Sequence, residues 1–316
     1  MSNFNPTDDI NVSFNEYVLN RQGVYASHVQ GGIPDYAFDS DYALRKKIKA
    51  LPGIYPFFKA LTSTWVPRKK QEINMHGLRV GPNQYADIYN IAVECADILG
   101  IGIPTVYIFP DPATINAYTI ATDDEAPIVV LYSSLVERFT KDEIRAIMGH
   151  ECGHIHNNHG IYSIAAQIIL EQGINAIPFV SQILSLISMP IRYMFMAWHR
   201  AGEVTCDRAG IICSADSMDI TKAFMKLMHG GMMGAEEANI EAALKQYEAL
   251  KKTPVRFLEL EQSHPVTVRR LLADLEFMNS DVLYKWRPEW KKPDMNLIAK
   301  QELDARCSKY VSVIKK

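Results

Sequence analysis

The sequence lacks the features that mark several classes of protein. Its 316 residues carry a net charge of -3 with no block of like charges, so the charge pattern predicts no nucleic-acid partner. The first residues, MSNFNPTDDINVSFNEY, contain neither a basic nor an apolar stretch, and we do not expect a secretory signal there. The five cysteines, an odd number in no framework spacing, argue against a disulfide scaffold and for a reducing compartment. We therefore expect a cytoplasmic protein.

The residues that are present fit a globular protein with a large apolar core. Hydrophobic residues make up 48% of the chain and charged residues 22%, which is ordinary for a globular domain. Helical periodicity and short β-rich runs both occur. We expect helices over residues 39–51, 84–101 and most of 140–278, and strands over residues 104–110, 114–120 and 127–136. This pattern predicts an α+β fold that is mostly α-helical with a small β-sheet.

One short stretch, GHECGHIHNNH, carries four histidines in eleven residues. The preceding TKDE has the pattern of a capping box, in which Thr140 and Glu143 satisfy each other's backbone amides where a helix begins. On that helix His150 and His154 are four residues apart on one face, close enough to bind one metal ion. Glu151 is turned by about 100° from His150. It could therefore reach a water on the metal without binding the ion itself.

The spacing H-E-x-x-H is typical of two zinc ligands and a general base. The alternative is an exposed helix face that is rich in histidine. A catalytic zinc needs a third protein ligand, and AGEVTCDRAG offers Glu203 and Asp207, again four residues apart. Glu203 could complete the site, while Asp207 could accept the ring N–H of a histidine ligand. A surface acidic pair has the same spacing, but the two motifs together favour a zinc site.

Two other histidines in these motifs are predicted not to bind the metal. His156 falls on the far side of the helix, and His159 lies about 90° from the two ligand histidines, where it could still form a hydrogen bond near the site. Cys152 and Cys206 also lie inside the motifs and are open to three interpretations: zinc binding as a thiolate, redox control or apolar packing. Packing is the commoner role for a cysteine at such a position.

Together the motifs resemble the gluzincin metallopeptidases. More closely, the chain resembles the zinc endopeptidase family of the heat-shock protease HtpX and the CAAX prenyl proteases. The similar pieces follow the family's order and cover roughly residues 116–270: INAYTI, VVLYSSLV, DEIRAIMGHECGHIHNNH, RAGEVTCDRAG and SHPVTVRR. We expect no N-terminal transmembrane helices of the kind found in the membrane-bound members, which argues against membrane residence and a lipidated-peptide substrate.

The resemblance implies a metallopeptidase domain with its small β-sheet beside the zinc helix, and one zinc ion per chain. It implies that His150, His154 and Glu203 are the zinc ligands and that Glu151 is the general base. It also implies that Asp207 supports one of the histidine ligands. It also places Asn116 and Ala117 on an edge strand that could bind substrate backbone, for which a plain hairpin strand is the alternative. His264, in SHPV, could donate to the oxyanion, form a regulatory zinc contact, or simply cap the next helix.

An uncharged segment, residues 172–191, lies between the two motifs. Its length would suit a transmembrane helix, but its prolines, amides and hydroxyls make a poor span. We favour a helical hairpin beside the cleft. Through residues 172–198 the protein could touch a membrane surface or self-associate.

We therefore expect a zinc metalloendopeptidase that hydrolyses extended or unfolded peptides and proteins in the cytoplasm. The alternative is a zinc-bearing module that holds client proteins with latent or no peptidase activity. The open site favours the enzyme, because a purely structural zinc is closed by four protein ligands. Along the chain we expect a helical preface (residues 1–70), the metallopeptidase domain (71–280) and a polar tail wrapped on the body (281–316).

Overall fold

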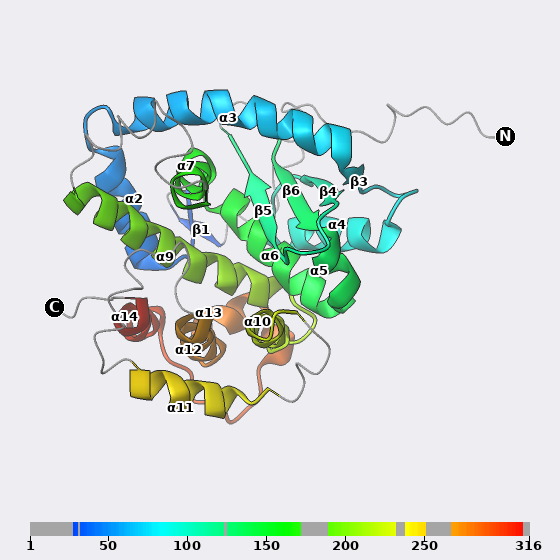
Figure 1. Ribbon diagram of the computed structural model, residues 1–316. Helices are drawn as coiled ribbons and strands as arrows, with labels where there is room; N and C mark the ends of the chain where they lie inside the picture. The colour runs from blue at the N-terminus through cyan, green and yellow to red at the C-terminus, as the bar shows by residue number, and fades with distance from the viewer. Residues whose placement is uncertain are drawn as a thin grey trace.

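The computed structural model describes residues 28–30, 32–122, 125–171, 189–231, 238–250 and 267–311 (Figure 1). The helices are α2 (Asp39–Lys49), α3 (Ile54–His76), α4 (Ala86–Leu99), α5 (Ser133–Arg138), α6 (Lys141–His156), α7 (Gly160–Glu171), α9 (Met189–Cys213), α10 (Asp219–Met228), α11 (Ile240–Leu250), α12 (Thr267–Met278), α13 (Asp281–Trp286), η3 (Pro288–Trp290) and α14 (Lys300–Val311). The strands are β1 (Val29–Gln30), β2 (Ile33–Pro34), β3 (Leu78–Arg79), β4 (Thr105–Phe109), β5 (Ala117–Ile120) and β6 (Ile128–Tyr132). The α+β class expected from the sequence is confirmed.

A mixed sheet of four strands in the order β3-β4-β6-β5 supports one half of the molecule. β4 and β6 run parallel, whereas β3 and β5 pair antiparallel at the two edges. Three of these strands were expected from the sequence. β3 was not, because two residues are too short to show an alternating pattern. The end of the expected strand over residues 127–136 is instead helix α5.

The sheet is covered on both faces. β4 and β6 therefore have apolar side chains on both sides and show no apolar–polar alternation. On one face Val129 and Leu131 belong to the apolar cluster formed with α4 and α6. On the other face Tyr118 and Val130 pack with residues of α3 and α7, and Figure 1 shows α3 running across this side. The sheet thus fixes α6 relative to the N-terminal helices.

Helix α3 was not among the helices expected from the sequence. Pro67 lies inside it, and a proline removes one backbone hydrogen bond and usually interrupts a helix. Buried Phe58, Leu61 and Val66 hold the helix against the sheet, so tertiary packing outweighs local propensity. The predicted boundary after residue 70 falls within α3, and the division of the chain into three parts stays a prediction.

Helix α6 begins at the expected capping box. Thr140 Oγ1 accepts the Glu143 amide at 3.2 Å, and Glu143 Oε2 accepts the Thr140 amide at 2.8 Å. The two amides at the start of the helix are thereby satisfied within one turn. The sequence therefore predicted correctly where the motif helix begins.

Helices α6 and α9 approach closely because small residues line their contact. A Cβ added at Gly149 would lie 2.5 Å from the Cβ of Cys213, and one at Gly153 would lie 2.8 Å from that of Ala209. Real Cβ atoms do not come so near, so only glycine fits at these turns. As a result the histidine-bearing turns of α6 lie against the acidic turns of α9.

Helix α14, in the last part of the described chain, packs on the body. Leu303 and Cys307 of α14 are buried, and Asp304 forms an ion pair of 2.8 Å with Arg208 of α9. Most of the uncharged segment, residues 172–188, lies outside the described residues, and its remainder forms the start of α9. In the part of the chain that is described, no helix is long and apolar enough to cross a membrane.

Candidate metal centre

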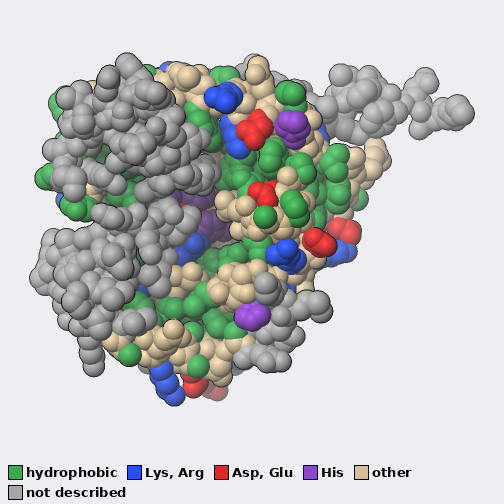
Figure 2. Space-filling view, viewed as in Figure 1, with side chains coloured by type: hydrophobic (Ala, Val, Ile, Leu, Met, Phe, Trp, Pro, Cys, Tyr) green, Lys and Arg blue, Asp and Glu red, His purple; other side chains and the backbone are tan. Residues whose placement is uncertain are grey.

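The two motif histidines turn the same ring nitrogen toward one acidic side chain. His150 and His154 have ring centroids 5.1 Å apart. The Nε2 atom of His150 lies 3.8 Å from Glu203 Oε2, and that of His154 lies 3.6 Å from Glu203 Oε1. Two ligands at about 2.1 Å from a tetrahedral ion are about 3.4 Å apart, so each of these two separations is close to that of a pair of ligands that share one metal. Figure 2 shows histidine side chains at the bottom of a hollow near the middle of the face.

The other ring nitrogen of each histidine has a hydrogen-bond partner. The Nδ1 atom of His150 lies 2.8 Å from Asp207 Oδ1, and that of His154 lies 3.0 Å from His159 Nδ1. Burial alone would lower the pKa of His150, but the hydrogen bond and charge of Asp207 raise it above its ordinary value. Burial lowers the pKa of His154 well below its ordinary value. Hydrogen bonds at Nδ1 leave both Nε2 atoms available to an ion.

Arg270 of α12 bridges the two acidic side chains of α9. Its Nε and Nη2 atoms lie 2.8 and 2.5 Å from the Asp207 carboxylate, and its Nη1 atom lies 3.1 Å from Glu203 Oε2. Burial would lower the pKa of Arg270, but the charges of Asp207 and Glu203 raise it. The guanidinium therefore compensates two carboxylates that are almost fully buried. In the sequence SHPVTVRR, only the charge of Arg270 could have suggested that it contacts the acidic residues of the site.

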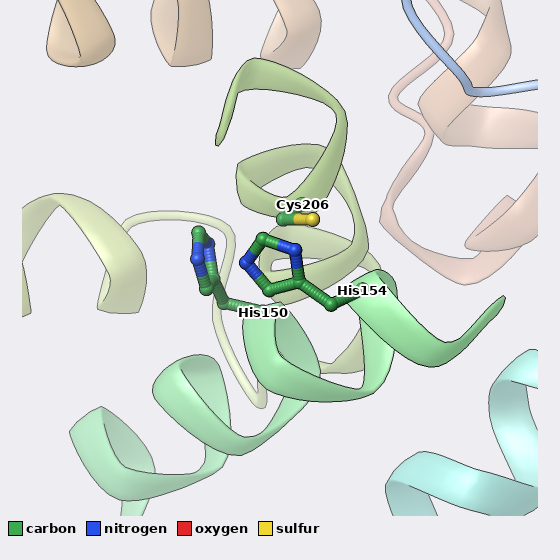
Figure 3. Close-up of side chains that lie close together, drawn as sticks. All are labelled: His150, His154 and Cys206. Carbon is green, nitrogen blue, oxygen red and sulfur yellow. The ribbon is translucent and has the colours of Figure 1, made fainter. Parts of the chain in front are cut away.

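Cys206 is a second candidate for the third ligand. Its sulfur and one nitrogen of each of His150 and His154 lie within 4.8 Å of one another, and Figure 3 shows the cysteine on α9 above the two rings. Its Sγ also lies 3.6 Å from His159 Nδ1, on the side that faces the Nδ1 atom of His154. Burial raises the pKa of the Cys206 thiol well above its ordinary value. The two histidines with Glu203 or Cys206 could thus hold a metal ion.

Glu151 lies beside the histidines and contacts the sheet. The Thr119 hydroxyl on β5 lies 2.7 Å from Glu151 Oε2 and 3.1 Å from the backbone oxygen of Glu151. Both residues are buried. The strand thus holds the carboxylate predicted to be the base, a contact that the sequence did not indicate.

Asn116 and Ala117 lie at the start of the edge strand β5. The Asn116 carbonyl accepts the Tyr132 amide at 3.0 Å, so the backbone of Asn116 faces β6. In an antiparallel ladder every second residue turns its N–H and C=O away from the partner, which directs those of Ala117 and Thr119 to the edge. Among the described residues, β5 pairs with β6 alone. No described strand therefore pairs with the outer side of β5, where the Ala117 amide donates to Asn116 Oδ1 at 2.9 Å.

The remaining predicted residues lie as follows. His156 points away from the centre and lies 2.9 Å from the Tyr36 hydroxyl, consistent with a residue that does not bind the metal. His159 lies between the end of α6 and the start of α7, so its expected place on the helix was wrong. It still forms the expected hydrogen bond near the site, 3.0 Å from His154 Nδ1, and it lies 2.9 Å from Asp41 of α2. Cys152 is buried and free. His264 lies outside the described residues, so its role stays a prediction.

These features define a class of protein: a helical domain with a candidate H-E-x-x-H metal centre beside the edge of a small sheet. Residues 82–276 match the family described as Peptidase family M48, which is more than half of the chain. The chain belongs to peptidase family M48. The resemblance noted from the motifs is thereby confirmed.

Three relatives show how far the similarity extends. The plastoglobule-localized metallopeptidase 48, chloroplastic, of Arabidopsis thaliana is 32% identical over 232 residues, 71% of this chain and 66% of the relative. A protease HtpX homolog of Streptococcus pneumoniae (strain Hungary19A-6) is 32% identical over 110 residues, 34% of this chain and 35% of the relative. Another, from Streptococcus pneumoniae serotype 19F (strain G54), is 32% identical over 123 residues, 39% of this chain and 38% of the relative. The chain spans just under two thirds of the plant relative and little more than a third of the bacterial ones. No solved structure matches the chain.

Proposed function

We propose that the chain is a zinc metalloendopeptidase that hydrolyses extended or unfolded peptides and proteins. The observation that carries this proposal is the convergence of two imidazole Nε2 atoms on the Glu203 carboxylate, with the Glu151 carboxylate beside them. Membership of a peptidase family supports it. His150, His154 and Glu203 would hold the ion, because both Nε2 atoms face that carboxylate whereas the Cys206 sulfur lies toward the Nδ1 side.

Each residue around the ion would have a separate role in peptide hydrolysis. When bound, a zinc ion activates a water molecule and polarises the carbonyl of the peptide bond. Glu151 would take the proton from that water and later deliver it to the leaving amine. Asp207 would keep the His150 ring in the tautomer that binds through Nε2. His264 would be a donor to the developing oxyanion.

Substrate would bind as an additional strand along β5. The Ala117 carbonyl and the backbone groups of Thr119 are directed to the edge and could pair with an extended peptide. The Ala117 amide donates to Asn116 Oδ1 at 2.9 Å, so it would have to exchange that partner for a substrate carbonyl. Such pairing uses main-chain atoms, which suits unfolded polypeptides with varied side chains. Because Thr119 also contacts Glu151, a peptide on this edge would lie next to the base.

For location we propose the cytoplasm. All five cysteines are free and buried, which suits a reducing compartment. The name of the plant relative gives chloroplast plastoglobules as the location of that protein. Contact with a membrane surface or self-association through residues 172–198 remains part of the proposal. Cell fractionation of the tagged full-length chain would test it, since recovery in the membrane pellet after a salt wash contradicts a purely cytoplasmic protein.

The proposed function is tested with the purified chain, zinc and a quenched peptide library. Cleavage should stop with phenanthroline, and product mass spectrometry identifies the bonds that are cut. Glu151→Gln should keep its zinc yet lose at least about a hundredfold in rate, the usual worth of a positioned general base. Glu137→Gln, an exposed residue of α5, is the matched control and should behave like the wild type. Zinc binding without any cleavage would instead favour a module that holds client proteins.

A further inference from the structure

A chain of hydrogen bonds runs from His154 to the N-terminal helix α2. The Nδ1 atom of His154 lies 3.0 Å from the Nδ1 atom of His159. The other nitrogen of His159, Nε2, lies 2.9 Å from Asp41 Oδ2. His159 and Asp41 have exposed fractions of 0% and 1%, so water does not compete for these contacts. A metal ligand is thus connected to a carboxylate through a second imidazole.

The proton positions along this chain follow from the ligand at its end. A histidine that binds a metal through Nε2 carries its proton on Nδ1. The N–H of His154 must then donate to His159 Nδ1, which leaves the His159 proton on Nε2, where it donates to Asp41. Two further contacts, His154 Nδ1 to Ser163 Oγ at 3.4 Å and His159 Nδ1 to Cys206 Sγ at 3.6 Å, are longer. The shortest contacts therefore form one directed path.

Asp41 is held firmly at the far end of the path. Its Oδ1 atom accepts the indole N–H of Trp198 at 2.9 Å, and its Oδ2 atom accepts the Thr205 hydroxyl at 2.9 Å. Thr205 in turn accepts the Phe38 amide at 3.1 Å, directly before α2 begins. Both carboxylate oxygens are thus occupied by donors. Such a group accepts hydrogen bonds only, and it fixes His159 in one tautomer.

The two ligand histidines are supported differently. His150 contacts the carboxylate of Asp207 directly. His154 instead contacts His159, and the ring of His159 contacts the carboxylate of Asp41. Asp41 lies outside residues 82–276, the part of the chain that matches the family. We propose that Asp41, acting through His159, is a positioning residue for His154, so that helix α2 is an integral part of the metal centre. This inference rests on the metal centre of the proposed function but not on its peptidase activity.

Asp41→Asn tests the proposal with little change in shape. Trp198 and His159 contact different oxygens of Asp41, and an asparagine in the same place replaces one of these oxygens by an NH2 group, so it can accept from only one of the two donors. Its amide could then donate to His159 and force the tautomer that is wrong for His154. We expect the zinc affinity, measured by competition with a chelator, to fall by about 10- to 100-fold, the usual effect of losing such a partner. The absorption spectrum of the cobalt-substituted variant should also change.

Two comparisons separate positioning from general loosening of the fold. Asp219→Asn changes another buried carboxylate, which contacts the Asp216 amide and Lys222 and has no contact with α2 among those of its side chain, so it should leave the zinc affinity unchanged. His159→Leu should weaken zinc binding as much as Asp41→Asn does. In the double variant that combines Asp41→Asn with His159→Leu, zinc affinity should be no lower than in His159→Leu alone, because the hydrogen-bond path is already interrupted.

The outcomes are distinct. Wild-type zinc affinity in both Asp41→Asn and His159→Leu overturns the proposal and leaves the proposed function standing. An equal loss in Asp219→Asn, or additive losses in the double variant, also overturns it. A wild-type chain that binds no zinc would remove the metal centre, and with it both this inference and the proposed function.

Discussion

The Thr119 hydroxyl and the Glu151 carboxylate lie 2.7 Å apart, which joins the edge strand of the sheet directly to the motif helix. The backbone oxygen of Glu151 lies 3.1 Å from the same hydroxyl. One threonine side chain therefore has two acceptors within reach on one residue. The direction of the carboxylate and the place of the strand are coupled through this contact.

Replacing Thr119 should affect turnover more than binding. Thr119→Val keeps the shape but removes the hydrogen bond to a charged group, worth about 1.5 kcal/mol, or about tenfold in kcat. We expect little change in KM and none in zinc content, as measured by peptide kinetics and metal analysis. Thr119→Ser restores a hydroxyl and should recover most of the rate. Equal rates in the valine and serine variants would contradict a role for the hydrogen bond.

Zinc content should distinguish Glu203 from its neighbours. Glu203→Ala should lose zinc and activity together, because the carboxylate faced by both Nε2 atoms is removed. Asp207→Ala should bind zinc about 10- to 100-fold more weakly. Cys206→Ala should keep its zinc after dialysis against a weak chelator. If the cysteine variant loses the metal while Glu203→Ala retains it, the third ligand has been assigned to the wrong side chain.

A methyl group between α6 and α9 should disturb both stability and metal binding. Gly149→Ala would bring a Cβ to 2.5 Å from that of Cys213, and relieving such overpacking costs about 1–3 kcal/mol. The helices would move apart, so zinc affinity should fall as well. Denaturant unfolding and chelator competition measure the two effects. Gly81→Ala, where an added Cβ has nothing within 4 Å, is the control.

The buried pair of Asp304 and Arg208 should stabilise the fold in a pH-dependent way. Burial would raise the pKa of Asp304, but the charges of Arg208 and Lys300 lower it below its ordinary value. Its contribution is therefore present above the unfolded-state pKa near 3.8 and is lost as the pH falls through the lower folded value. Asp304→Asn should cost about 3 kcal/mol at pH 7.

The measurement is denaturant unfolding of both proteins between pH 7 and pH 3. The deficit of the variant should start to shrink as the pH falls below about 3.8, because the carboxyl of the unfolded wild type then takes up a proton while the folded form stays ionised to lower pH. Loss of metal at low pH is common to both proteins and cancels in the difference. A deficit that stays constant across the range would mean that the charge of Asp304 does not contribute.

The sequence by itself determined what depends on spacing within one element. The capping box of Thr140 and Glu143 predicted where α6 begins, because both partners lie within one helical turn. The same periodicity put His150 and His154 on one face. β4 and β6 were recognised from their apolar residues, whereas β3 was too short and α3 was hidden by Pro67. Local signals thus identified the candidate site but not all of its framework.

Only the tertiary structure decided which side chains serve each histidine. His150 forms a hydrogen bond with Asp207, and His154 forms one with His159. The spacing of the motifs alone did not show which histidine would contact which partner. Asp41 reaches His159 across 118 positions of sequence. Contacts over such separations depend on how α2, α6 and α9 pack against one another and on how the sheet places α6. Such packing leaves no periodic pattern in a single sequence.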